Sequence, residues 1–201
     1  LSSYSLPLAV SKMVSVRLAN KQYRTTVRIL RVSLAYATVV GGIAAFVIWF
    51  GADFFAAKIF FMPYAAFALK TLAPTVWIMA YLGVFRGYYQ GRGTMVPTAF
   101  SQVLEQIMNA IVSVAAGSIL FHEALKVEAL KGKGASGYAN AWGAAGGTIG
   151  TGAGAFMALA FLLFVFALYK KQIRRQVKRD RSGSLAGYGE ITKALFFTVI
   201  P

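Results

Sequence analysis

Residues 141–169 form a stretch without a single charged side chain, and most of its residues are apolar. A helix that crosses a bilayer needs roughly 20 such residues, so this stretch is long enough to span. The rest of the chain shares the bias, since 58% of its 201 residues are hydrophobic, 13% are charged and the mean hydropathy is +0.61. We therefore expect an integral membrane protein.

Further apolar stretches alternate with charged connectors along the chain. The segment 53–70 is apolar but contains Asp53, Lys58, Pro63 and Lys70, which favours an interfacial or re-entrant segment over a span. We expect an all-α, polytopic membrane helix bundle of about five spans plus the start of a sixth, forming a single transmembrane region over residues 1–201. The expected spans are about Leu1–Val16, which is short and holds Pro7 and Lys12, then Val32–Ala52, Thr71–Tyr89, Pro97–Phe121 and Ala141–Tyr169, with the sixth beginning near 191.

Neither end of the sequence looks like the natural end of a protein. The chain opens on LSSYSLPLAV, which is already apolar, lacks an initiator Met and has no signal-peptide pattern. It closes on ALFFTVIP, which reads as the beginning of a helix. We expect both ends to continue in a longer protein.

The Lys and Arg residues behind the formal charge of +15 are concentrated in the connectors on one expected side of the membrane. Alternating the spans across a bilayer places the connectors 17–31, 86–96 and 170–193 on one side, and these hold fifteen of the 21 Lys and Arg residues. The segments 53–70 and 122–140 on the other side hold five. Cytoplasmic connectors of membrane proteins carry such an excess, so we expect the first set, including the basic connector 170–192, to be cytoplasmic, with some attraction to anionic lipid.

Other uses of this composition are less consistent with the sequence. The segment RGYYQGRG faintly resembles an RNA-binding repeat, but the apolar segments on both sides exclude the solvated context that binding nucleic acid requires. The chain has no cysteine and a single histidine, His122, and we find no nucleophile triad, carboxylate pair or metal-ligand spacing. We predict no catalytic residue, no metal and no cofactor, and hence a protein that is not an enzyme.

The segment GAAGGTIGTGAG at 143–154 places a glycine at every fourth position, namely Gly146, Gly150 and Gly154. Small residues at this spacing let membrane helices pack closely. A phosphate-binding loop is the alternative, but the segment lacks the Lys-Ser/Thr ending of that motif and no soluble strand precedes it. We predict helix packing for these glycines.

A polar stripe lies on the expected helix that starts at Pro97. Helical spacing places its members on one face, and an ionised acid at mid-span costs about 2.5–3.5 kcal/mol on insertion scales. We expect the stripe to line a bundle interior or water-filled cavity, while hydrogen bonding between helices, worth about 0.6–2 kcal/mol each, stays open as the alternative. Its members are Thr98, Gln102, Glu105, Asn109 and Ser113, with Gln106 one residue round the helix.

Three further polar residues could contribute to a cavity. Lys12 lies five residues after Pro7 and could bind phosphate as a point charge, or extend toward the headgroups. Arg86 and Gln90 lie one turn apart and could meet the polar stripe, although Arg86 also fits an ordinary positive-inside anchor. The glycines Gly87, Gly91 and Gly93, together with Pro97, predict a tight turn. For His122 an ordinary position at the end of a span is favoured over a metal site or proton relay.

Four segments, taken in order, resemble one family. RGYYQGRGTMVPTAFSQVLEQ at 86–106 is similar to the fourth-to-fifth helix signature of the polysaccharide-transport branch of the multidrug/oligosaccharidyl-lipid/polysaccharide (MOP) exporter superfamily, and within it to the families of stage V sporulation protein B and of the MurJ-like lipid II flippases. LPLAVSKMVS resembles the second helix of that family. YANAWGAAGGTIGTGAGAF resembles the sixth, and ITKALFFTVIP the entry to the seventh.

The resemblance implies a fold of fourteen transmembrane helices in two pseudo-symmetric bundles around a central cavity. This chain would supply helices two to six and the first turns of helix seven. The implied cavity residues are Lys12, Arg86, Gln90, Gln102, Glu105 and Gln106, and Asn109 joins them through the polar stripe.

The resemblance also implies the activity, which is export or flipping of an undecaprenyl-linked saccharide, such as a polysaccharide or peptidoglycan precursor, across the bacterial cell membrane by alternating access. Basic cavity groups would bind pyrophosphate and the polar stripe would bind sugar. Glu105 is the candidate for coupling to H⁺ or Na⁺, and the membrane potential is another driving force to consider. A drug/cation antiporter of the MATE branch and a non-transporting scaffold of cell-envelope assembly stay open as alternatives.

Overall fold

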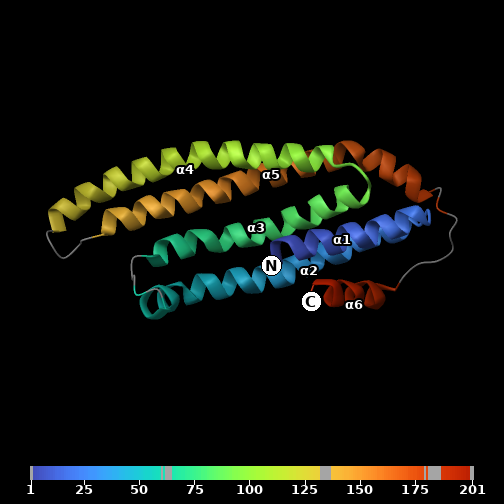
Figure 1. Ribbon diagram of the computed structural model, residues 1–201, viewed down its shortest axis with the longest axis horizontal. Coiled ribbons are helices and arrows are strands. Elements are labelled where there is room, and N and C mark those ends of the chain that lie inside the picture. The colour runs from blue at the N-terminus through green and yellow to red at the C-terminus, as the bar shows by residue number, and fades with distance from the viewer. Residues whose placement is uncertain are drawn as a thin grey trace. The chain divides into compact units, whose positions relative to one another are not determined.

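The computed structural model describes residues 2–59, 61, 65–131, 137–178, 180 and 187–199. Within these residues all regular structure is helical, which confirms the all-α class (Figure 1). A π-helical turn, Phe55–Ile59, follows the second helix directly. The six α-helices are α1 (Ser2–Ala19), α2 (Tyr23–Phe54), α3 (Ala66–Gly91), α4 (Val96–Lys131), α5 (Tyr138–Lys178) and α6 (Tyr188–Val199).

Four of the described helices are long and apolar enough to cross a membrane. They are Tyr23–Ile59, Ala66–Gly91, Val96–Leu130 and Tyr138–Lys178. The polytopic bundle is thus confirmed. α1, which we expected to be a span, is not among these four helices. Its 18 residues are only just long enough, and Lys12, Arg17 and several serines lower its hydropathy.

The helices extend well past the apolar cores expected as spans. α2 begins at Tyr23, so most of the expected basic connector 17–31 is its first turns, and α5 continues through residues 170–178 of the other connector. Lys, Arg and Gln are good helix formers, so charge alone does not end a helix. The segment 53–70 is also largely helical in its described part, since α2 and its π-turn run to Ile59 and α3 starts at Ala66. Pro63 lies outside the described residues.

The chain divides into two compact units. Unit 1 comprises Leu1–Val40, Met79–Gln102 and Leu159–Pro201, and unit 2 comprises Gly41–Ile78 and Val103–Ala158. Each of α2, α3, α4 and α5 therefore contributes one part to each unit. The core of unit 1 is built from branched and aromatic side chains on five helices, including Val10, Ile29, Val84, Tyr88 and Leu195.

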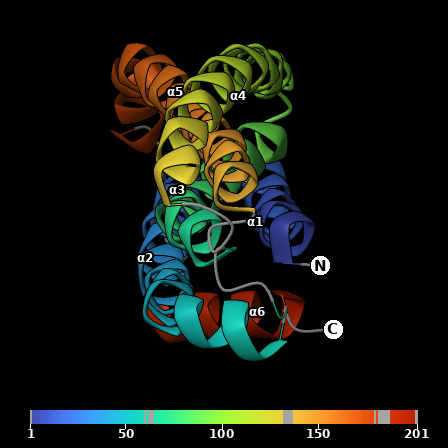
Figure 2. The ribbon, with the colours of Figure 1, turned by 90° about the vertical axis from the view of Figure 1, so that its left-hand side faces the viewer.

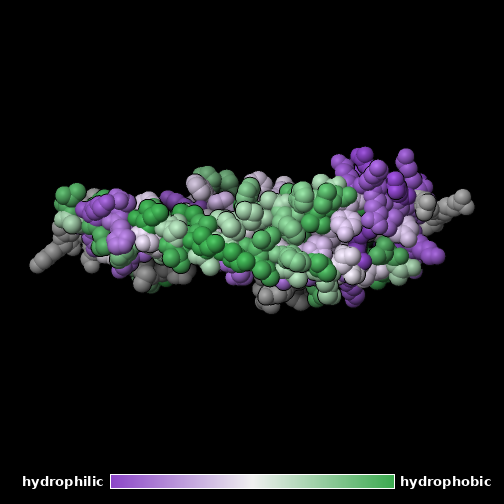
Figure 3. Space-filling view, turned by 90° about the horizontal axis from the view of Figure 1, so that it is seen from above, coloured by the Kyte–Doolittle hydropathy of each residue, from purple (hydrophilic) through white to green (hydrophobic). Residues whose placement is uncertain are grey.

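Unit 2 buries small side chains instead. Every hydrophobic residue that is buried among its described residues is an alanine, such as Ala73, Ala145 and Ala155. Its large hydrophobic side chains, such as Ile107 and Ile111 on α4, are exposed, as expected for helices whose outer faces meet lipid. Figure 3 shows such hydrophobic side chains along the face it draws, with hydrophilic residues gathered at the last turns of α5.

Candidate functional site

The glycine stripe of α5 lies against the polar stripe of α4 in unit 2. A methyl group built at Gly154 would lie 2.6 Å from the carbonyl oxygen of Glu105 and 3.2 Å from Cβ of Asn109. One turn earlier, a methyl group at Gly150 would overlap Ser113, and one at Gly146 would overlap Gly117. Only glycine permits this approach of the two backbones (Figure 2).

Two members of the polar stripe form hydrogen bonds at this contact. The Ser113 hydroxyl is 3.1 Å from the carbonyl oxygen of Gly147 and 2.8 Å from Oδ1 of Asn109. Thr151 on α5 also donates to Asn109 Oδ1, at 3.5 Å. Asn109 and Ser113 thus form hydrogen bonds between helices, and the cavity role of Asn109 stays a prediction.

The remaining members of the stripe divide between buried and exposed positions. Glu105 is only 8% exposed, whereas Gln102 and Gln106 are exposed. In unit 1 the same helix buries Thr98 and Ser101, which is fully buried. Ser101 was missed by the sequence analysis, although it lies one turn before Glu105 on the same side of the helix.

Arg86 contacts α4 within unit 1. Its Nε donates a hydrogen bond to the Ser101 hydroxyl at 3.1 Å, and that hydroxyl donates to the carbonyl oxygen of Thr98 at 2.7 Å. The guanidinium is therefore directed to α4, although to Ser101 and not to a member of the predicted stripe, and a cavity role for Arg86 stays a prediction. Gln90, one turn later on α3, is half-buried.

Two glycines expected in a turn lie inside α3 instead. A methyl group at Gly87 would lie 2.9 Å from Cα of Pro7, and one at Gly91 would lie 2.6 Å from the carbonyl oxygen of Ser11. The turn prediction was wrong for Gly87 and Gly91, because these glycines make room for α1. It fits Gly93, which has a φ of +74° in the short connection between α3 and α4.

Lys12 is exposed on α1, one residue beyond Ser11, whose carbonyl oxygen lies against Gly91 of α3. Its roles as a phosphate ligand or as a headgroup anchor both stay predictions. His122 is exposed near Phe121, with ring centroids 6.0 Å apart. In the part of the chain that the structure describes, no group of three or more His, Asp or Glu residues could hold a metal ion.

Unit 2 also contains polar contacts that the sequence analysis did not identify. The hydroxyls of Thr71 on α3 and Thr148 on α5 are hydrogen-bonded, and a methyl group at Gly152 would lie 2.7 Å from the Thr75 hydroxyl. Thr71, Thr75 and Gly152 border a mainly apolar cavity of about 500 Å³, lined from α2 by Trp49. The sequence could have indicated these contacts, because Thr71 and Thr75 are one turn apart and so lie on one face of the helix.

The sequence is similar to parts of two bacterial proteins. It is 32% identical to stage V sporulation protein B of Bacillus subtilis (strain 168) over 174 residues, which is 87% of this chain and 30% of that protein. It is 28% identical to lipid II flippase MurJ of the same organism over 119 residues, which is 55% of this chain and 22% of that protein. The chain thus spans less than a third of either relative. No protein-family profile and no solved structure matches the chain.

Proposed function

Because the chain is homologous to part of two MOP-superfamily proteins, stage V sporulation protein B and lipid II flippase MurJ, we propose that it forms part of a flippase or exporter for an undecaprenyl-linked saccharide. The observation that carries the proposal is the alignment to the first relative over 87% of this chain. The four apolar helices and the absence of any identified catalytic residue support transport rather than catalysis.

The proposed mechanism is alternating access, in which two helix bundles open a shared midplane site to each side of the membrane in turn. Lys12 and Arg86 would bind pyrophosphate, because both are cationic and Arg86 is held by Ser101. Gln90, Gln102, Gln106 and Asn109 would bind sugar or line the aqueous path. Glu105 would couple transport to H⁺ or Na⁺, since a buried acid in a membrane helix is costly and commonly functional.

The proposed location is the bacterial cytoplasmic membrane, with 17–31, 86–96 and 170–193 on the cytoplasmic side. The alternation of Lys and Arg along the sequence supports this orientation, and both relatives come from a bacterium.

The test uses the full-length protein in a bacterium depleted of its own flippase, and in vesicles loaded with lipid-linked precursor. Glu105→Gln and Lys12→Ala are each expected to reduce flipping about ten- to hundredfold, the range for losing one charged hydrogen bond. Glu123→Gln is the matched control, since Glu123 lies on the same helix but is exposed and paired with Lys126.

Activity equal to wild type in both variants would contradict the assigned site. Efflux of cationic drugs driven by Na⁺ or H⁺, with no movement of lipid-linked substrate, would replace the proposal with a MATE-type antiporter. A reconstituted protein that moves neither substrate but retains envelope-assembly partners would replace it with a scaffold.

A further inference from the structure

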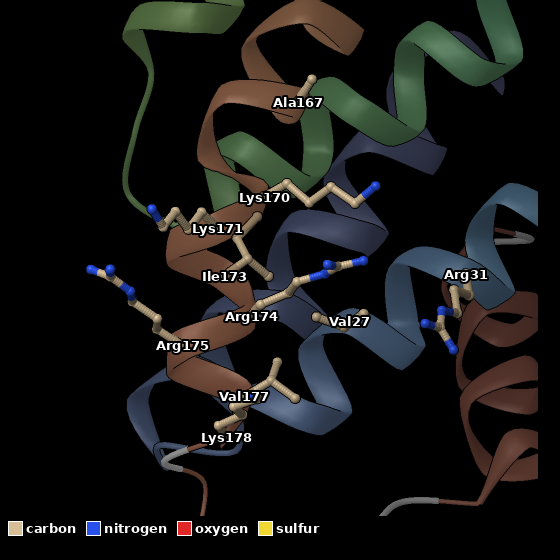
Figure 4. Close-up of a pocket in the computed structure, with 10 residues that line it drawn as sticks. All are labelled: Val27, Arg31, Ala167, Lys170, Lys171, Ile173, Arg174, Arg175, Val177 and Lys178. Atoms are coloured by element: carbon tan, nitrogen blue, oxygen red, sulfur yellow. The ribbon is translucent and has the colours of Figure 1, made fainter.

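A cavity of about 760 Å³ lies between α2 and the last turns of α5, entirely within unit 1 (Figure 4). Its apolar lining includes Val27, Ile173 and Val177, and Ile173 belongs to the buried core of the unit. The rest of the lining is almost wholly cationic. The cationic residues are Arg31, Lys170, Lys171, Arg174, Arg175 and Lys178.

The cationic side chains point in two directions. Figure 4 shows Lys170 and Arg174 reaching from α5 into the space on the α2 side, where α2 carries Arg31. Lys171 and Arg175, each one residue further along, also border the cavity, but their side chains point away from α2. The helical period explains the division, since residues four apart share a face and adjacent residues do not. Three cations from two sequence-distant segments therefore converge on one apolar-walled space.

The lining of the cavity includes no acidic side chain. All six acidic residues of the chain lie at described positions, and none lines the cavity. The acid nearest in sequence, Asp180, is buried and accepts a hydrogen bond from the Arg24 backbone N–H at 2.7 Å. Cations gathered against an apolar wall raise the local positive potential and concentrate anions there.

The cavity lies where the apolar part of α5 ends. Lys170 directly follows the uncharged stretch that closes on Tyr169, and Phe164 and Leu168, just before it, are exposed hydrophobic residues. This is the transition from acyl chains to headgroups expected at a membrane surface. Basic pockets between helices at such a surface suit anionic lipid headgroups.

We propose that this cavity binds the phosphate of an anionic phospholipid, with Lys170, Arg174 and Arg31 as its ligands and Val27 and Ile173 against the glycerol and upper acyl chains. Guanidinium groups bind phosphate oxygens through paired, charge-assisted hydrogen bonds. Membrane orientation by positive charge alone would require neither a cavity nor convergence from two helices. The proposal stands whether or not the protein transports a saccharide.

The test compares two double variants of the full-length protein in phosphatidylcholine bilayers containing phosphatidylglycerol. Lys170→Gln with Arg174→Gln removes the two α5 cations that point toward α2, called the inward pair. Lys171→Gln with Arg175→Gln removes the same two residue types at the same spacing from the other side of the helix. Phosphatidylglycerol retained by each purified protein is measured by native mass spectrometry, and Arg31→Gln serves as an independent variant on α2.

The variant with Lys170→Gln and Arg174→Gln is expected to lose at least about tenfold in phosphatidylglycerol affinity, because it loses one or more charged hydrogen bonds. Arg31→Gln should also weaken phosphatidylglycerol binding. The variant with Lys171→Gln and Arg175→Gln, the outward pair, should lose clearly less affinity. Equal losses in both double variants would overturn the site in favour of diffuse surface attraction. Stronger competition by undecaprenyl pyrophosphate than by phosphatidylglycerol would make it a substrate site, and displacement by inorganic phosphate alone would make it an ion site. Either outcome overturns the proposal.

Discussion

Unit 1 buries Val10, Ile29 and Leu195, whereas every buried hydrophobic residue described in unit 2 is an alanine. The first unit is held together by large side chains that interdigitate, and the second by backbones that approach closely at Gly146, Gly150 and Gly154. Hydrophobic burial gains little between helices in lipid, because acyl chains are as apolar as leucine. Close backbone packing and hydrogen bonds remain as sources of stability, and the contact between α4 and α5 in unit 2 has both.

The sharpest way to test the contrast is to remove a large buried side chain from unit 1. Ile29→Ala is expected to lower the free energy of unfolding by about 2–5 kcal/mol, because Ile29 is fully buried and its loss leaves a cavity. Ile43→Ala is the control on the same helix, where the side chain is 61% exposed. Reversible unfolding in detergent measures both variants, and similar small effects would contradict the description of the unit 1 core.

In unit 2 the destabilising change is an added methyl group. Gly150→Ala is expected to cost about 1–3 kcal/mol, because the new methyl overlaps the backbone of Ser113. Gly147→Ala is the matched control, since a methyl there meets nothing within 4 Å, and alanine should be neutral or slightly stabilising in a helix. The same unfolding measurement applies, and tolerance of both substitutions would argue against the α4–α5 contact.

The smallest expected effect tests the hydrogen bonds of that contact. Ser113→Ala removes the bond to the Gly147 carbonyl, and such bonds between membrane helices average about 0.6 kcal/mol. Ser118→Ala on the same helix, at an exposed position, should change the free energy of unfolding less. A loss as large as that of Gly150→Ala would mean that hydrogen bonding, rather than backbone fit, holds unit 2 together.

Residue spacing predicted the two helix faces that form the contact in unit 2. The period of the polar residues after Pro97 predicted one face of α4, and the glycine period predicted a close-packed face on α5. Spacing alone does not name the partner, so it did not indicate that these two faces meet. It also did not distinguish Gln102, which is exposed, from Ser101, which is fully buried.

Other differences came from partners far away in the sequence. Gly87 and Gly91 come shortly before the turn at Gly93, so the sequence placed them in that turn. Their contacts with Pro7 and Ser11 show that they allow α1 to pack closely against α3. Arg31 and Arg174 each fit the positive-inside pattern, and that explanation was sufficient until their convergence on one cavity was seen. A sequence pattern with one adequate explanation does not exclude a second use.

The length of α5 has a consequence for its last turns. At 1.5 Å per residue, its 41 residues extend about 60 Å, roughly twice the thickness of the hydrocarbon layer. A helix that crosses the layer must therefore continue far into water, where its backbone amides can exchange with solvent. At that end, Gln176 accepts a hydrogen bond from Arg92 and the Val177 carbonyl accepts one from Arg24. We expect slow amide hydrogen exchange around Gln176 and Val177, because these contacts protect the last turns of the helix.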